Sequence, residues 1–116
     1  MKILKDIGEI EPGTVHLELT GDVDYVSYSE LKKLLSKIIS SGTKKIIIDL
    51  SSAKHIDSSG IGAITSAHIK INSTGGKIYI VSCNEGINRI FDITGLSKVI
   101  KIHRDLSSAM SDIKKG

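Results

Sequence analysis

The chain has 116 residues, a length that fits one domain and that can bury a core without disulfides or metal ions. Its net charge of +3 is mild, its acidic and basic residues are interspersed, and only 3% of its residues are aromatic, so the composition argues against direct nucleic-acid binding. It has one cysteine, which excludes an intrachain disulfide, and no signal-like or membrane-spanning stretch of ~18 apolar residues, so we expect a cytoplasmic protein without a membrane partner.

The start of the chain predicts two strands joined by a tight turn. Residues 3–10 are a weak strand candidate, whereas residues 15–20 alternate apolar and polar side chains, as a half-buried strand does. Between them, Pro12 fixes its own φ and Gly13 accepts a positive φ, a combination typical of a turn. We therefore expect an antiparallel hairpin at the N-terminus.

The rest of the chain alternates helices with strands. Apolar residues at helical spacing predict helices over residues 31–39, 60–74, 87–91 and 106–113. Short β-branched runs predict strands over residues 44–50, 77–82 and 99–102. The order ββαβαβαβα is typical of an α/β fold, in which parallel βα units and the hairpin form one mixed β-sheet with helices packed on it. We expect residues 1–116 to form a single domain.

Helix caps are predicted from polar residues that precede each apolar stretch. Ser27 and Glu30 predict a capping box, in which each side chain satisfies a free backbone amide of the first helix. Asp57 or Ser58 is expected to cap the second helix, and the expected caps of the last two helices are Asn84 and Asp105.

The central stretch Ile56–Gly62, Ile-Asp-Ser-Ser-Gly-Ile-Gly, does not fit the catalytic and nucleotide-binding motifs that contain similar residues. A dinucleotide fingerprint would follow its strand at once and carry a third glycine, and here only Gly60 and Gly62 match. A Walker loop at Gly75–Lys77 would lead into a helix, but a strand is predicted there. A serine hydrolase elbow needs glycines two residues away on both sides of the serine, which neither Ser58 nor Ser59 has.

The other candidate chemical groups are scattered along the sequence. The four histidines have no obvious catalytic partner, so we expect them to be surface or boundary residues; they are His16, His55, His68 and His103. No group of histidines, cysteines and acids has the spacing of a metal site, and we expect neither a metal nor a cofactor. The sequence therefore gives no sign of an enzyme.

Two interpretations of the central stretch remain open from the residues alone. Asp57 or Ser58 can be an ordinary helix cap, with the glycines allowing close packing on the sheet or on a partner. Alternatively, a serine among small residues at an exposed loop-to-helix junction can be phosphorylated, because the added charge of about −1.5 to −2 would disrupt an interface while leaving the fold intact.

Several motifs together resemble the bacterial anti-sigma factor antagonists, which belong to the STAS domain family. They are Gly21–Asp24, Ile46–Leu50, Ile56–Gly62, Gly75–Lys77 and Arg89–Leu96, and the resemblance extends from about Val15 to Met110. It implies a STAS fold and a protein that binds an anti-sigma factor, itself a serine kinase, and so releases a sigma factor. It also implies that the kinase phosphorylates Ser58 to end this binding, and that a serine phosphatase reverses the modification.

The resemblance further implies a binding surface and no catalysis by the chain itself. The residues that it places at the partner surface are Asp22, Asp24, Asp57, Ser58, Ser59, Gly60 and Gly62. The alternative within the same family is a STAS scaffold without a phosphorylation switch, such as a stressosome-like subunit or an accessory of lipid transport.

Overall fold

A computed structural model describes the backbone of residues 2–115 and the side chains of residues 11–115. These residues form β1 (Lys2–Glu11), β2 (Thr14–Val23), α1 (Tyr28–Ser40), β3 (Lys45–Ile56), α2 (Ser58–Asn72), β4 (Lys77–Val81), α3 (Glu85–Ile93), a short 3₁₀ helix (Leu96–Lys98), β5 (Ile102–His103) and α4 (Leu106–Lys115). The predicted α/β order of strands and helices is confirmed. Within this range, no helix is both long enough and apolar enough to cross a membrane.

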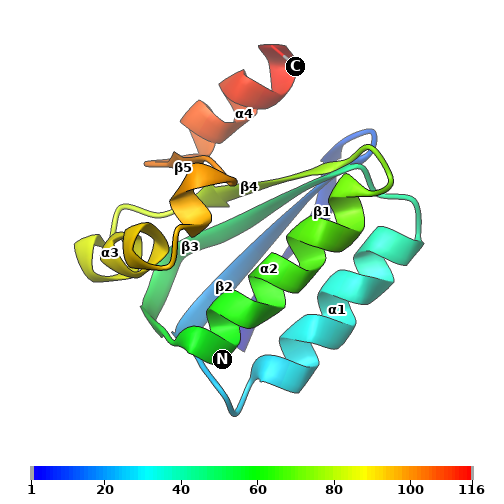
Figure 1. Cartoon of the computed structure of the whole chain (residues 1–116). Helices are drawn as coiled ribbons and strands as arrows, with labels where there is room; N and C mark the ends of the chain where they lie inside the picture. The colour runs from blue at the N-terminus through cyan, green and yellow to red at the C-terminus, as the bar shows by residue number, and fades with distance from the viewer. Residues whose placement is uncertain (1, 116) are drawn as a thin grey trace.

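The strands form one five-stranded sheet in the order β1-β2-β3-β4-β5 (Figure 1). β1 and β2 pair antiparallel, and each later strand pairs parallel with the one before it. Gly13, in the turn between β1 and β2, has a φ of 79°, which glycine adopts at little cost. Each parallel pair is connected through a helix, so β2, β3 and β4 end at the same edge of the sheet.

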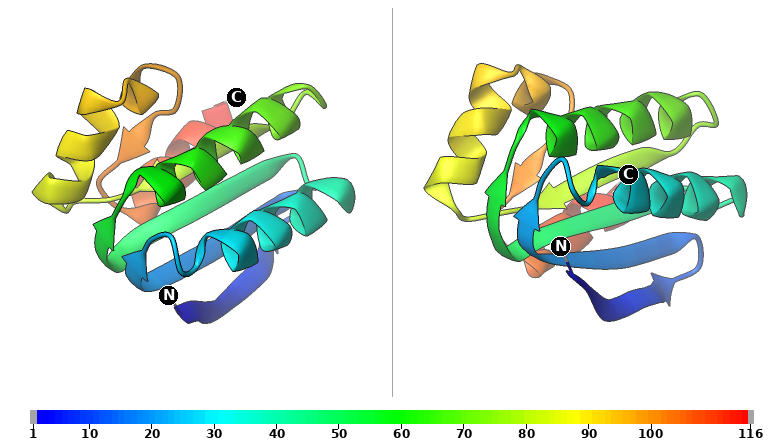
Figure 2. Two further views of the ribbon diagram at one scale, coloured as in Figure 1. Left: turned by 60° about the horizontal axis from the view of Figure 1, so that its bottom comes forward. Right: turned by 90° about the horizontal axis from the view of Figure 1, so that it is seen from below.

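Helices cover both faces of the sheet, and alternating residues of β3 and β4 supply the two cores. α1 and α2 lie side by side on one face, and α4 lies on the other (Figure 2). Leu17, Ile46 and Ile48 belong to the larger core, to which α1, α2 and α3 contribute. Their neighbour Ile47 packs on the opposite face with Ala109 and other residues of a smaller core beneath α4. This is the two-residue period of a strand that is buried on both sides.

β3 extends further, and β5 is shorter, than the sequence predicts. β3 continues past Leu50 to Ile56 because β2 pairs with it along its length, up to the pair Val23 and Ile56. Asp57 therefore follows a strand directly, so the expected loop-to-helix junction is a strand-to-helix junction. The strand predicted over residues 99–102 is reduced to Ile102–His103 because the 3₁₀ helix precedes it and the amide of Ile100 donates to the carbonyl of Leu96 (2.9 Å).

The predicted caps are confirmed for three helices and wrong in detail for the first. Asp57, Asn84 and Asp105 each accept hydrogen bonds from backbone amides at the start of α2, α3 and α4. Ser27 is the N-cap residue of α1, but its side chain makes no capping hydrogen bond. Its hydroxyl is instead engaged with Asp24 in the preceding turn, so the capping box predicted with Glu30 is absent.

Candidate functional site

The predicted partner residues gather where β2 and β3 end. These parallel strands are in register up to Val23 and Ile56, so the chain segments that follow them start side by side. We call residues 22, 24–26 and 57–62 the strand-end surface. It combines Asp22 of β2, the loop from β2 to α1 and the first turns of α2. The carboxyl ends of parallel strands are where α/β proteins commonly place their binding sites.

Asp57 connects three segments of this surface. Its Oδ1 accepts the amides of Ser59 (2.8 Å) and Gly60 (3.1 Å), which caps α2. Its Oδ2 accepts the amide of Tyr25 (3.2 Å), and its own amide donates to the carbonyl of Val23 (3.1 Å). Asp57 thus holds the β2–α1 loop against the start of α2.

Asp24 organises the loop from within. Its Oδ1 accepts the backbone amides of Val26 (3.1 Å) and Ser27 (3.3 Å), an arrangement that forms a compact turn. The turn leaves Tyr25 79% exposed and Val26 86% exposed, which are high values for large apolar side chains. Sequence reasoning missed both residues, although two apolar residues between Asp24 and Ser27 in a loop were a visible signal.

Ser58 and Ser59 differ in their surroundings. Ser58 is the first residue of α2 and is exposed, and its hydroxyl makes no hydrogen bond to another described residue. Ser59 is half-buried, and its amide is held by Asp57. The Ser58 hydroxyl is therefore accessible to another protein and is not needed for the fold.

The two glycines of the motif have different roles. A Cβ on Gly60 would lie 2.6 Å from the carbonyl oxygen of Val23 and 2.7 Å from Cγ1 of Ile56, so a side chain there would push α2 away from the sheet. Gly62 is exposed, and a Cβ there would meet nothing within 4 Å. Gly60 is thus required by the packing of this domain, whereas Gly62 leaves a flat stretch of α2 on the outside.

The strand-end surface is acidic and partly apolar. Its charged side chains are the carboxylates of Asp22, Asp24 and Asp57, and its sequence contains no basic residue. Asp22 is exposed, and Asp24 is half-buried in its turn. The surface therefore offers an apolar pair, a free hydroxyl and negative charge to a partner.

Two of the histidines are buried, and the prediction of surface or boundary positions was wrong for them. His16 Nε2 lies 2.8 Å from Asp49 Oδ2 across the β2–β3 pair. His103 contacts the hydroxyl of Ser108 (2.9 Å) and the carboxylate of Asp112 (3.1 Å), both in α4. The partners that make burial favourable lie on neighbouring elements, which spacing along the chain does not reveal.

Comparison with known proteins places these features in a family. The model of the STAS domain matches residues 8–109. A Thermotoga maritima protein with the name "Putative anti-sigma factor antagonist" is 32% identical over 84 residues, which cover 72% of this chain and 74% of the relative. The anti-sigma-B factor antagonist of Staphylococcus aureus is 26% identical over 87 residues, which cover 75% of this chain and 81% of the relative.

Solved structures show the same fold. The crystal structure of a Thermotoga maritima protein, also described as a "putative anti-sigma factor antagonist", has a TM-score of 0.85 at 29% identity and covers 90% of this chain and 91% of its own. The unphosphorylated form of the anti-sigma factor antagonist SpoIIAA has a TM-score of 0.73 at 16% identity, with 99% and 97% covered. The fold and the order of its elements are therefore shared over nearly the whole chain.

Proposed function

Because this chain belongs to the STAS domain family, we propose that it is an anti-sigma factor antagonist whose binding is abolished by phosphorylation of Ser58. In its unphosphorylated form it would bind an anti-sigma factor that is also a serine kinase, and so release a sigma factor. A serine phosphatase would restore the active form. The observation that carries this proposal is the exposed Ser58 hydroxyl, free of hydrogen bonds to the described residues, at the centre of the strand-end surface.

Tyr25 and Val26 are suited to be the apolar anchors of the unphosphorylated complex. Aromatic residues are enriched at the centres of protein interfaces, where a few buried side chains supply most of the binding free energy. Both residues are held beside the start of α2 by the hydrogen bond from the Tyr25 amide to Asp57. A partner that covers them would also cover Ser58.

A phosphate on Ser58 would change this surface without disturbing the fold. The amides of Ser59 and Gly60, which could otherwise bind an anion at the helix start, already donate to Asp57. The phosphate would therefore add about −1.5 to −2 charge next to Asp57, on a surface that already carries two further carboxylates, and would remain exposed. Burying that charge under a partner would be costly unless the partner supplied cations.

The test combines phosphorylation with binding measurements. With the anti-sigma factor kinase and ATP, the chain should gain one phosphate by intact mass, at Ser58 by peptide mapping. Ser59→Ala should be modified as the wild type is, and Ser58→Ala should not be modified. In calorimetry with the same anti-sigma factor, Ser58→Asp should bind at least a hundredfold more weakly, and Ser58→Ala should retain its affinity.

The outcomes distinguish the phosphorylation switch from the alternative, a STAS scaffold without such a switch. Phosphate at another residue, or an unchanged affinity of Ser58→Asp, would contradict the switch. If neither the wild type nor Ser58→Ala bound an anti-sigma factor, the non-switching STAS scaffold would be the better description.

A further inference from the structure

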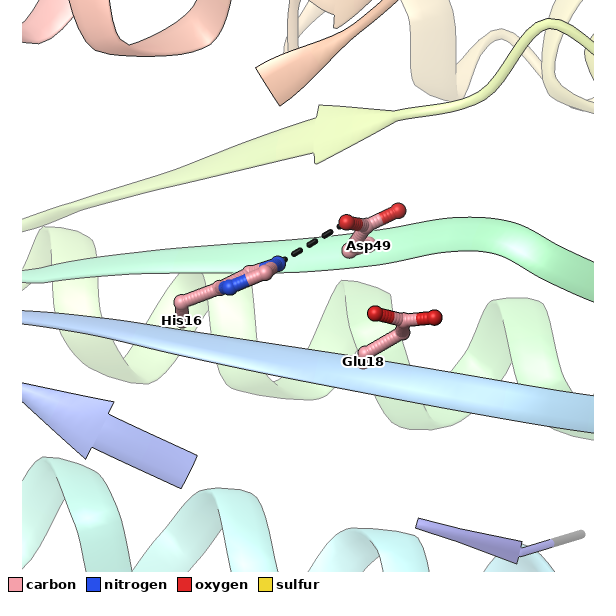
Figure 3. Close-up of side chains that lie close together, drawn as sticks. All are labelled: His16, Glu18 and Asp49. Atoms are coloured by element: carbon pink, nitrogen blue, oxygen red, sulfur yellow. Dashed lines mark hydrogen bonds and ion pairs between the residues drawn. The ribbon is translucent and has the colours of Figure 1, made fainter. Parts of the chain in front are cut away.

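A histidine and two carboxylates converge on the face of the sheet opposite to α1 and α2. His16 and Glu18 belong to β2, and Asp49 belongs to β3. Each residue offers one ligand atom, and the three atoms lie within 4.8 Å of one another. Figure 3 shows the three side chains close together on the β2–β3 pair, with the His16 ring directed at the Asp49 carboxylate.

The strand register explains why these residues meet. His16 and Glu18 are two positions apart, so they project to the same face of β2, while Leu17 and Leu19 project into the larger core. Glu18 is the register partner of Asp49 on β3. Since Asp49 lies 31 residues after Glu18 in the sequence, the group was not recognised from ligand spacing.

A register shift places two serines beside the carboxylates. Glu18 pairs with Asp49 and Thr20 pairs with Ser52, so β3 has one more residue than β2 in this interval. The Ser51 amide (2.9 Å) and hydroxyl (2.5 Å) donate to Asp49 Oδ1, and the Ser52 hydroxyl donates to Glu18 Oε2 (2.9 Å). The serines thus hold one oxygen of each carboxylate, and Asp49 Oδ2 also lies 2.8 Å from His16 Nε2. Residues around a metal site commonly orient its ligands by such hydrogen bonds.

The charges of the group favour a cation. His16 and Asp49 are buried and Glu18 is half-buried, so their interactions are only partly screened by water. Among residues 11–115, no lysine or arginine is paired with Glu18 or Asp49. Two carboxylates thus lie beside one imidazole without a paired lysine or arginine from this range, an arrangement that suits a bound cation.

We propose that His16, Glu18 and Asp49 bind a divalent transition metal ion, with Zn²⁺ as the representative ion. An imidazole nitrogen with two carboxylate oxygens suits Zn²⁺, Mn²⁺ or Fe²⁺, whereas Ca²⁺ and Mg²⁺ prefer oxygen ligands alone. Zn²⁺ with ligands at about 2.1 Å needs ligand atoms about 3.4 Å apart, so His16 Nε2 and Asp49 Oδ2, which lie 2.8 Å apart, must separate slightly and Glu18 must adjust its position. Glu18 can provide this movement, because it is half-buried and only its Oε2 is bonded to a described residue. Three protein ligands leave the remaining coordination to water.

The experiment is a titration of the full chain with Zn²⁺, by calorimetry in competition with a chelator of known affinity. We expect one ion per chain and a higher Tm in the presence of the ion. Glu18→Gln, which keeps the size of the side chain, should lower the affinity at least tenfold. Ser52→Ala removes the hydrogen bond that orients Glu18 and should lower the affinity by about tenfold. Circular dichroism checks that both variants are folded.

Matched variants distinguish this site from other metal-binding groups of the chain. Asp112→Asn alters the carboxylate beside the other buried histidine, and Cys83→Ser removes the exposed thiol, so both should bind Zn²⁺ as the wild type does. In NMR spectra, the imidazole signals of His16 should shift with Zn²⁺ and those of His103 should not. Absence of Zn²⁺ binding, or binding that persists in Glu18→Gln with unshifted His16 signals, would overturn the proposal.

Discussion

At the scale of single residues, the central motif contains positions that the fold requires and exposed positions that the fold does not require. Asp57 accepts backbone amides with both carboxylate oxygens. Gly60 lies so close to β2 and β3 that any side chain at this position would collide with them. Ser58 and Gly62 are exposed. The fold thus requires the first pair, and the second pair is available to a partner.

Removing the Asp57 carboxylate should destabilise the protein, while removing the Ser58 hydroxyl should not. Asp57→Ala leaves the amides of Ser59, Gly60 and Tyr25 without their acceptor, and the loss of a helix cap costs about 1–2 kcal/mol of unfolding free energy. Ser58→Ala is the matched control, with an expected change within about 0.5 kcal/mol. Urea unfolding measures both, and equal effects of the two variants would contradict this division of roles.

The two glycines should respond in opposite directions to the same substitution. Gly60→Ala introduces a Cβ next to the Val23 carbonyl and should cost about 1–3 kcal/mol, the usual range for overpacking. Gly62→Ala adds a methyl group at an open helical position and should stabilise the fold by about 0.5–1 kcal/mol. Thermal and urea unfolding check the signs, and a stabilised Gly62→Ala that binds the anti-sigma factor less tightly would place Gly62 in the interface.

At the scale of secondary-structure elements, α4 is attached to the sheet by polar contacts as well as by its core. His103 on β5 contacts Ser108 and Asp112 of α4, and Tyr79 on β4 lies 6.4 Å from the His103 ring. Burial, and secondarily the Asp112 carboxylate, raises the pKa of the Tyr79 phenol above its ordinary value of 10.0. This cluster therefore links the ionisation of Tyr79 to the packing of α4.

The raised pKa of Tyr79 predicts a loss of stability in alkali. In the unfolded chain, Tyr79 ionises near its ordinary pKa of 10.0, whereas in the folded protein it ionises at higher pH. Its contribution to stability should be complete below pH about 10 and should disappear as the pH rises through the folded-state pKa. Tyr79→Phe should show a smaller decline of Tm above pH about 10 than the wild type. An identical decline would mean that Tyr79 ionises normally.

The periodicity of apolar residues predicted which helices and strands exist. It did not predict where an element ends when that end depends on pairing with a neighbouring strand. The sequence of β3 is continuously apolar only as far as Leu50, yet the strand continues because β2 pairs with it beyond that residue. The strand expected from Val99 is partly replaced by a 3₁₀ helix, and Val99 is exposed. The burial of His16 and the exposure of Tyr25 likewise depend on contacts with segments distant in the sequence, so local patterns contain little information about them.

At the scale of the whole molecule, the sheet separates two cores of unequal size. Among residues 11–115, 23 buried residues form the core on the side of α1 and α2, and five form the core under α4. Segments with little buried apolar surface open at lower free energy than the rest of a domain. α4 should therefore be the most easily detached helix.

Hydrogen exchange of the native protein tests whether α4 opens more easily than the helices of the larger core. The amides of α4 should exchange faster than those of α2, and Ile113→Ala should accelerate exchange in α4 while leaving α2 nearly unchanged. A matched substitution in the larger core, Ile71→Ala, should affect α2 and lower the stability of the whole domain. Uniform protection across α2 and α4 in the wild type would show that the two cores unfold as one unit.

The tight contact between α2 and the sheet affects how the same motif should be interpreted in related protein sequences. The pattern Asp-Ser-Ser-Gly is easily taken as the recognition sequence of a kinase, but here its first and last residues serve the domain itself. Under the proposed function, a descendant that lost the kinase would remain under selection to keep Asp57 and Gly60, while Ser58 would be free to change. Searches for phosphorylation-controlled members of such a lineage should therefore score the hydroxyl position alone and give no weight to its flanking residues.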